Sequence, residues 1–170
     1  MTVLLVEGES DRAALLALAP RLGLGLASVD VLAIGGAGNF PAAIAAHPGA
    51  GGLYDANEER DVVRGLARAG RSGDPAAEGF HRCDPDLEAE LIAALGIDAM
   101  LAVLERDGQG ERFRKFQNQP FQRARPIAAQ LRRFLGTTSG RKVRYGRLLA
   151  EAVPLDAVPA PLRAVLGSGA

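Results

Sequence analysis

The feature that most limits the possible folds is an unbroken apolar run, TVLLV at residues 2–6, which ends in Glu7. Its apolar residues do not alternate with polar ones, and this predicts a strand that is buried on both faces. Such strands belong to parallel sheets that carry helices on both sides. The chain is therefore expected to be an α/β protein, and the carboxylate that ends the run needs an explanation of its own.

The first half of the chain alternates strand-like and helical segments, the order that a parallel sheet with right-handed crossovers requires. Ser10 is expected to be the N-cap of the first helix. The glycine-rich segment at 35–40 reads as a turn, because it lacks the Lys-Ser/Thr end of a phosphate-binding loop. We expect strands at 2–7, 29–36, 51–57 and 80–83, helices at 11–19, 41–47 and 58–70, and a loop at 71–79.

The second half has the apolar spacing and the glycine and proline boundaries of helices. We expect helices at 85–96, 97–108, 111–118, 122–135 and 140–152, followed by a short apolar tail. With 170 residues the chain is long enough for one domain with an appendage. We expect an α/β core at 1–95 and a basic helical extension at 96–170 that packs on it.

The two halves differ in charge although the chain as a whole is neutral. Residues 1–105 hold 7 Lys/Arg and 16 Asp/Glu, whereas residues 106–147 hold 12 Lys/Arg and 2 Asp/Glu. This asymmetry predicts that the first part binds cations and the second part binds anions. No apolar run is long enough to span a bilayer, and the single cysteine, Cys83, is expected to be a small buried residue. We therefore expect a cytoplasmic protein without a membrane partner.

Three of the expected apolar runs end in acid: Glu7 ends the first and Asp55 the third, and Asp84 and Asp86 follow the fourth. Ligands of parallel sheets bind beyond the carboxyl ends of the strands. Carboxylates that cluster there repel one another, and a divalent cation with oxygen ligands commonly compensates the charge. A second acidic set is expected to be only a solvated helix start: Glu58, Glu59 and Asp61.

Four segments, in order, resemble the motifs of the Toprim domain, a metal-dependent fold of topoisomerases, primases and nucleases. They are VEGESDRAAL (6–15), LYDANEE (53–59), DLEAELIAALG (86–96) and GRKVRYGRLLAE (140–151). The Ser-Asp pair after Glu-Gly is closest to the version in OLD-family (overcoming-lysogenization-defect) nucleases. The resemblance covers residues 2–152 and implies a Toprim-like, Rossmann-like parallel sheet of about four strands.

The resemblance also implies a site. Glu7 would be a metal ligand and a candidate general acid or base, and Lys142 would stabilise charge on the scissile phosphate. The ion would be Mg²⁺ or Mn²⁺. The metal ligands carried over from the family pattern are Glu7, Asp11, Asp55, Asp86 and Glu88.

The chain departs from the family pattern in two ways. Asn57 stands where the family has a second aspartate, which leaves one metal or two open unless Glu58 or Glu59 substitutes. OLD proteins also carry an ATPase domain before the Toprim domain, and no such segment is present here. We therefore expect a stand-alone Toprim protein or one whose ATPase partner is a separate chain, with a homo-oligomer left open.

Basic residues in the extension alternate with phenylalanines, a composition that suits nucleic-acid binding. Phe113 and Phe116 are three residues apart and are expected to be core residues. The cations either contact DNA phosphates or pair internally with the acidic part of the chain. The residues expected to bind nucleic acid are Arg112, Arg114, Lys115, Arg123, Arg125, Arg132, Arg133, Arg141 and Arg144.

Together these features predict a divalent-metal-dependent nuclease that acts on DNA phosphodiesters. The alternative is a catalytically degenerate Toprim protein that serves as a nucleic-acid-binding or regulatory subunit, an interpretation that Asn57 favours. A phospho-acceptor domain with Asp55 as its acceptor is disfavoured, because the segment after the fourth strand is acidic and helical where such a domain needs a lysine.

Overall fold

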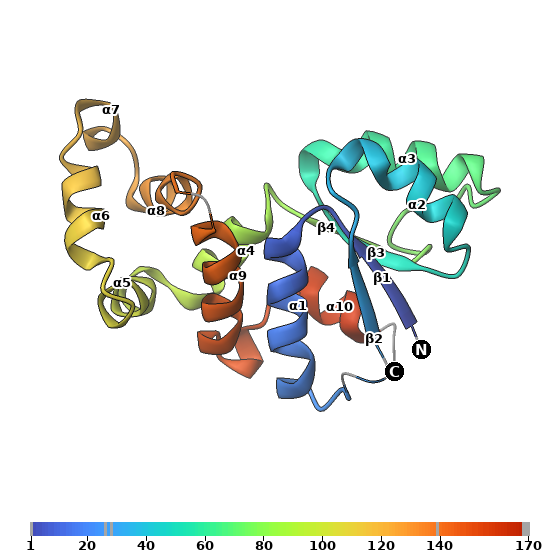
Figure 1. Ribbon diagram of the computed structural model, residues 1–170, viewed down its shortest axis with the longest axis horizontal. Helices are drawn as coiled ribbons and strands as arrows, with labels where there is room; N and C mark the ends of the chain where they lie inside the picture. Colours follow the sequence, from blue (N-terminus) through green and yellow to red (C-terminus); the bar gives the residue numbers. More distant parts are fainter. Residues whose placement is uncertain (1, 26, 28, 139, 168–170) are drawn as a thin grey trace.

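The structure is a computed structural model and describes residues 2–25, 27, 29–138 and 140–167. Its centre is a parallel four-stranded sheet with the strand order β2-β1-β3-β4 (Figure 1). The strands are β1 (Thr2–Val6), β2 (Val29–Ala33), β3 (Gly51–Asp55) and β4 (Phe80–Cys83). The predicted α/β class and the four predicted strands are confirmed.

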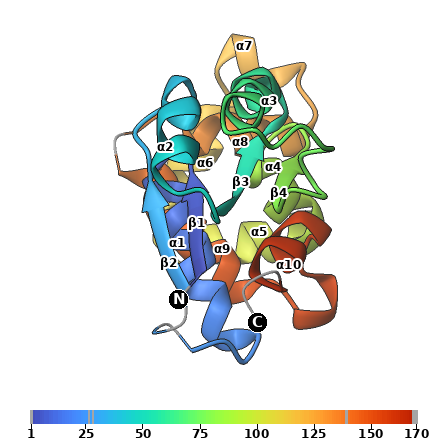
Figure 2. The same cartoon turned by 90° about the vertical axis from the view of Figure 1, so that its right-hand side faces the viewer.

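Helices cover both faces of the sheet (Figures 1 and 2). Helices α2 (Phe40–Ala46) and α3 (Glu59–Arg68) cover one face, and α1 (Glu9–Arg21) covers the other. Successive residues of β1 enter different cores: Leu4 and Val6 pack with α1, whereas Leu5 packs with α2 and α3. The apolar run does not alternate because both faces of this strand are buried.

The remaining helices form a lobe beside the sheet and then return to it (Figure 1). Helix α9 packs on α1, and α10 lies against β3 and β4. The division of the chain at residue 95 therefore stays a prediction. The elements are α4 (Leu87–Leu95), α5 (Ile97–Arg106), α6 (Gly110–Gln117), α7 (Pro120–Arg123), α8 (Ile127–Leu135), α9 (Arg141–Ala152) and α10 (Ala160–Gly167), with short 3₁₀ turns η2 (Ala37–Asn39), η3 (Ala56–Glu58) and η4 (Leu155–Ala157).

Three phenylalanines hold the lobe together. Phe134 of α8 makes edge contacts with Phe113 and Phe116 of α6, with ring centroids 5.2 and 5.5 Å apart. All three rings are buried, which confirms that Phe113 and Phe116 are core residues. Cys83 is also buried at the end of β4, as predicted. Phe121, in contrast, is 85% exposed.

Two local predictions were wrong. The helix expected at 122–135 is two helices, because Pro126 disfavours helical geometry at the residue before it and caps α8 instead. Ser10 is not the N-cap of the first helix: α1 begins at Glu9, with Gly8 as its cap, and Ser10 is buried inside it. No helix within the described residues combines the length and apolar character needed to cross a membrane.

Candidate metal centre at the carboxyl edge of the sheet

The candidate site lies where the chain changes direction in the sheet. From β1 the chain moves to one side to form β2 and then crosses to the other side to form β3. The carboxyl ends of β1 and β3 are therefore adjacent, while the connections that follow them run to opposite faces. Such a switch point is the place where open parallel sheets bind ligands.

Three carboxylates meet at this switch point. Glu7 follows β1, Asp55 ends β3, and Glu58 ends the 3₁₀ turn η3 directly after β3. One oxygen from each lies within 4.8 Å of the others. The structure therefore brings together two of the predicted ligands and Glu58, which the sequence had left open as a substitute for the missing second aspartate.

Glu58 is 3% exposed, so the prediction that it is solvated was wrong. The turn η3 folds its side chain back, and Glu58 Oε2 accepts a hydrogen bond from the backbone N–H of Asp55 at 2.9 Å. The signal was present in the sequence, because Asp-x-x-Glu is the spacing of a capping box. Glu59 and Asp61 form surface ion pairs, as expected of a helix start. Asn57 is exposed, on the solvent side of the same turn.

Burial and mutual repulsion raise the pKa values of these acids. The pKa of Asp55 rises to about 7, chiefly because of burial and then because of the charges of Asp11, Asp86 and Glu88. The pKa of Glu58 rises to about 8, chiefly because of burial and then because of a hydrogen bond with the Glu7 side chain. Carboxylates this close hold a proton near neutral pH unless a cation replaces it.

Asp11 and Asp86, two further predicted ligands, lie nearby and cap helices. Asp11 Oδ2 accepts the backbone N–H of Gly8 at 3.0 Å, at the start of α1. Asp86 Oδ1 accepts the backbone N–H of Ala89 at 2.9 Å, at the start of α4. In both residues one carboxylate oxygen is therefore engaged in a hydrogen bond that stabilises the start of a helix.

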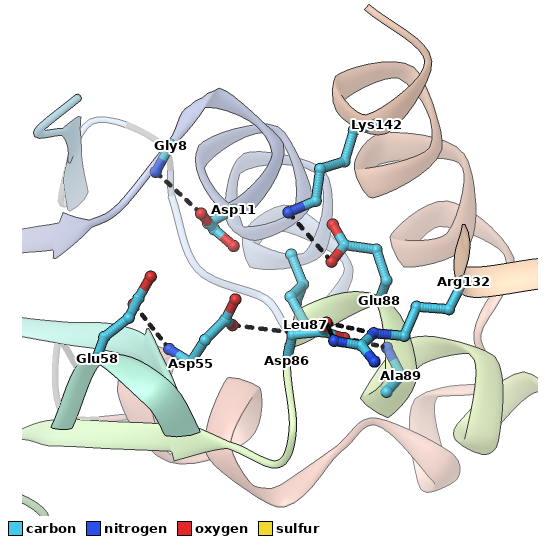
Figure 3. Close-up of polar contacts among 10 residues, drawn as sticks. All are labelled: Gly8, Asp11, Asp55, Glu58, Asp86, Leu87, Glu88, Ala89, Arg132 and Lys142. Atoms are coloured by element: carbon cyan, nitrogen blue, oxygen red, sulfur yellow. Dashed lines mark hydrogen bonds and ion pairs between the residues drawn. The ribbon is translucent and has the colours of Figure 1, made fainter. Parts of the chain in front are cut away.

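Two cations from the lobe approach the same edge (Figure 3). Lys142 Nζ of α9 lies 3.4 Å from Glu88 Oε2, and the Arg132 side chain of α8 pairs with Asp86 Oδ2. Burial alone would lower the pKa of Lys142, but the neighbouring carboxylates, Glu88 first among them, raise it overall. Lys142 is therefore a permanent positive charge beside the acidic group.

Glu88 supplies an observation that points to a ligand. It is 3% exposed, and its Oε1 is buried without a hydrogen-bond partner among the described residues. A buried oxygen of this kind normally has a partner, and an ion or a water is the usual one when the protein supplies none. Carboxylate oxygens are the ligands that Mg²⁺ and Mn²⁺ prefer, so the residues fit a divalent ion.

Apart from Arg132, which reaches the acidic edge, the predicted nucleic-acid-binding residues are distributed over the lobe. Arg114, Lys115 and Arg144 pair with acids of the lobe itself, namely Glu105, Glu111 and Asp107. Arg123 and Arg125 donate to main-chain carbonyls of the α7 region, and the Arg141 guanidinium lies 4.0 Å from the centre of the Phe134 ring. Arg112 and Arg133 form no ion pair with a described residue. Among the described cations of the lobe, only Arg132 and Lys142 pair with acids of the candidate site, namely Asp86 and Glu88.

Comparisons with known proteins identify the fold. No protein-family model matches the sequence, and no curated protein matches it significantly. The C-terminal region of the OLD protein of Burkholderia pseudomallei matches with a TM-score of 0.72 at 20% identity, over 99% of this chain and 96% of that chain. The C-terminal region of the OLD protein of Xanthomonas campestris pv. campestris matches with a TM-score of 0.73 at 23% identity, over 98% and 90% of the chains.

These matches span almost the whole chain, including the helical lobe. At identities of 20–23% the matches establish the fold. Any chemical activity has to be argued from the side chains of this chain. The resemblance to the Toprim region of OLD proteins that the four sequence motifs predicted is therefore confirmed at the level of the fold.

Proposed function

We propose, from the fold of the OLD C-terminal region and the carboxylates at its sheet edge, that this protein is a divalent-metal-dependent nuclease. Its substrate would be a phosphodiester of DNA. The observation that carries the proposal is the convergence of Glu7, Asp55 and Glu58 within 4.8 Å, at the switch point of a parallel sheet. Only the bond that Glu58 accepts from the Asp55 N–H supports the local fold, and bringing three acids together otherwise costs free energy because their charges repel one another.

Glu7, Asp55 and Glu58 would hold the ion, and Glu88, whose Oε2 pairs with Lys142, would offer its free Oε1. An Mg²⁺ or Mn²⁺ ion bound there would polarise the scissile phosphate and neutralise charge on the leaving oxygen. Asp11 would contribute through Oδ1, since its Oδ2 accepts the N–H of Gly8, whereas both oxygens of Asp86 are already engaged by Ala89 and Arg132.

The chain's own residues supply the remaining parts. Lys142 stays protonated and would stabilise charge on the phosphate. Glu7 would accept or donate the proton that the reaction moves, because its side chain lies against that of Glu58 at the centre of the carboxylate group. Arg132 and Arg133 would hold the flanking backbone of the substrate.

The test is plasmid cleavage with Mg²⁺, with Mn²⁺ and with EDTA. We expect cleavage only with a metal ion and its loss in Glu7→Gln and in Asp55→Asn. Glu9→Gln is the matched control, because Glu9 is an exposed acid of the same turn that pairs only with Arg12 among the described residues. Retained cleavage in both site variants would overturn the proposal.

One result would favour the second candidate function. Salt-sensitive nucleic-acid binding without cleavage under any divalent metal would assign a nucleic-acid-binding or regulatory role, with a separate ATPase as a candidate partner. The pairing of Asp86 with Arg132 and of Glu88 with Lys142 is the observation that supports this alternative, because the cations already neutralise those two acids.

A further inference from the structure

A groove of about 630 Å³ opens beside the acidic edge and runs into the helical lobe. Asp86 and Glu88 of α4 line it on the side of the sheet, and Gln119 and Gln122 of the α7 region line it on the side of the lobe. Figure 1 shows α7 at the outer end of the lobe, with α8 between it and α9. The groove therefore runs from Asp86 and Glu88, beside the candidate metal centre, to the α7 region of the lobe.

The groove carries cations that are available to an anionic chain. Arg132, Arg133 and Lys142 line it. Arg133 forms no ion pair with a described residue, and the Arg132 side chain is half-exposed although it pairs with Asp86. Phosphates that follow one another along a strand are the ligand that such a row of cations attracts.

Phe121 belongs to α7, the short helix whose neighbouring residues Gln119 and Gln122 line the groove. It is 85% exposed, the highest value among the large apolar side chains that are exposed, and it lies between the groove residues Gln119 and Gln122 in sequence. The Arg125 Nε donates to the backbone carbonyl oxygen of Phe121 at 3.1 Å, so this cation is tied to the segment that carries Phe121. An exposed aromatic ring on a basic segment is a side chain on which proteins stack unpaired bases.

The segment that carries Phe121 is held in place by amide hydrogen bonds. Gln130 Nε2 of α8 donates to the carbonyl oxygens of Gln122 at 2.8 Å and of Arg125 at 3.0 Å, and Gln130 Oε1 accepts from Gln117 at 2.8 Å. These bonds attach α7 to α6 and α8. The exposed ring is thus presented by a supported turn.

Gln122 adds a polar contact that the protein leaves unused. The residue is 4% exposed and lines the groove, and its Oε1 has no hydrogen-bond partner within the described part of the chain. An unsatisfied buried acceptor costs free energy unless a ligand donates to it. The N–H groups on the edge of an unpaired base are donors of the required kind.

We propose that this groove binds single-stranded nucleic acid, with a base stacked on Phe121 and phosphates on Arg132 and Arg133. The inference rests on the proposed function, since it names the form of substrate that reaches the carboxylates. A continuous duplex offers phosphates but no free base face, and so it would leave Phe121 and Gln122 without partners.

The test is fluorescence anisotropy in EDTA with three labelled probes: oligothymidylate, oligouridylate and a blunt DNA duplex. We expect single strands to bind more tightly than the duplex and Phe121→Ala to weaken single-strand binding about 5- to 150-fold, the range that loss of one stacked base produces. Phe121→Trp should retain binding. Val63→Ala, which removes an exposed apolar side chain on α3, is the control and should have no effect.

The two oligonucleotides distinguish DNA from RNA, and a preference for either sugar supports the proposal. Equal binding of single strands by Phe121→Ala and the unmodified protein would overturn it, as would tighter binding of the duplex. Loss of binding in Phe121→Trp would also overturn it, because that ring can still stack. The assay needs no cleavage, so a failed nuclease test and a failed groove test are separate results.

Discussion

The backbone N–H of Asp55 donates to Glu58 Oε2 at 2.9 Å, so two of the three acids at the switch point belong to one turn of the chain. The bond aims the Glu58 carboxylate at the space between β1 and β3, where Glu7 joins it. A residue that looks like an ordinary helix start is in this way part of the candidate metal centre.

Glu58→Gln should therefore weaken Mn²⁺ binding about 10- to 100-fold, the usual effect of removing a group that supports a metal site. Titration calorimetry measures this directly. Glu59→Gln is the matched control, because Glu59 is the next residue and pairs at the surface with Arg82. Equal Mn²⁺ affinities for the two variants would show that Glu58 has no part in the site.

The pKa values of Asp55 and Glu58, raised to about 7 and about 8, predict that stability depends on pH. A carboxyl group with a raised pKa favours the folded state at pH values where it is protonated in both states, and this contribution is lost as the pH rises through the folded-state value. The metal-free protein should therefore melt at a lower temperature at pH 8.5 than at pH 5.5. The expected difference is at least about 2–4 °C, the shift that 1 kcal/mol produces in a chain of this size.

The two melting temperatures are measured by circular dichroism, because the chain has no tryptophan whose fluorescence could report unfolding. Mg²⁺ or Mn²⁺ should raise the melting temperature more at pH 8.5, because protons no longer compete for the ligands. Glu58→Gln should flatten the pH dependence. A melting temperature that is the same at both pH values in EDTA would contradict the prediction.

Gly146 sets the position of α9 and hence of Lys142, one turn earlier on the same face of the helix. A Cβ at Gly146 would lie 2.5 Å from the carbonyl oxygen of Ser10 on α1, so Gly146→Ala must push the two helices apart. We expect a loss of about 1–3 kcal/mol in the free energy of unfolding. Cleavage should fall as well, because Lys142 moves away from Glu88.

Gly167→Ala is the matched control for this change. Gly167 is also helical, and a Cβ there meets nothing within 4 Å. Alanine has the higher helix propensity, so this control should be neutral or slightly stabilising. Thermal melts of the two variants side by side separate the close approach at Gly146 from the general effect of replacing glycine in a helix.

Lys142→Met should reduce cleavage about 10²- to 10³-fold, the typical effect of removing one group that stabilises developing charge. Binding of single strands in EDTA should change little, because Arg132 and Arg133 remain. The chain has one other lysine, Lys115, which pairs with Glu111 on the surface of α6. Lys115→Met should cleave at the normal rate, and an equal loss in both variants would rule out a specific role for Lys142.

The sheet was predictable from the sequence because a strand that is buried on both faces needs an apolar side chain at every position. Leu4, Leu5 and Val6 are all apolar, and each enters one core or the other. The ends of helices were less predictable. Ser10 has the right residue type for a cap, but Asp11 provides the bond to Gly8 instead, and cap choice depends on backbone angles that the sequence does not display.

The sequence by itself determined the parallel α/β class, the acids that end β1 and β3, and the unequal distribution of charge, because hydrophobic pattern and charge are local properties of the chain. Only the tertiary structure decided which acids meet. A 3₁₀ turn buries Glu58 and leaves Asn57 exposed, and the close packing of α9 on α1 brings Lys142 to Glu88. Those contacts depend on how far one element lies from another, and that distance is set by packing across the whole molecule.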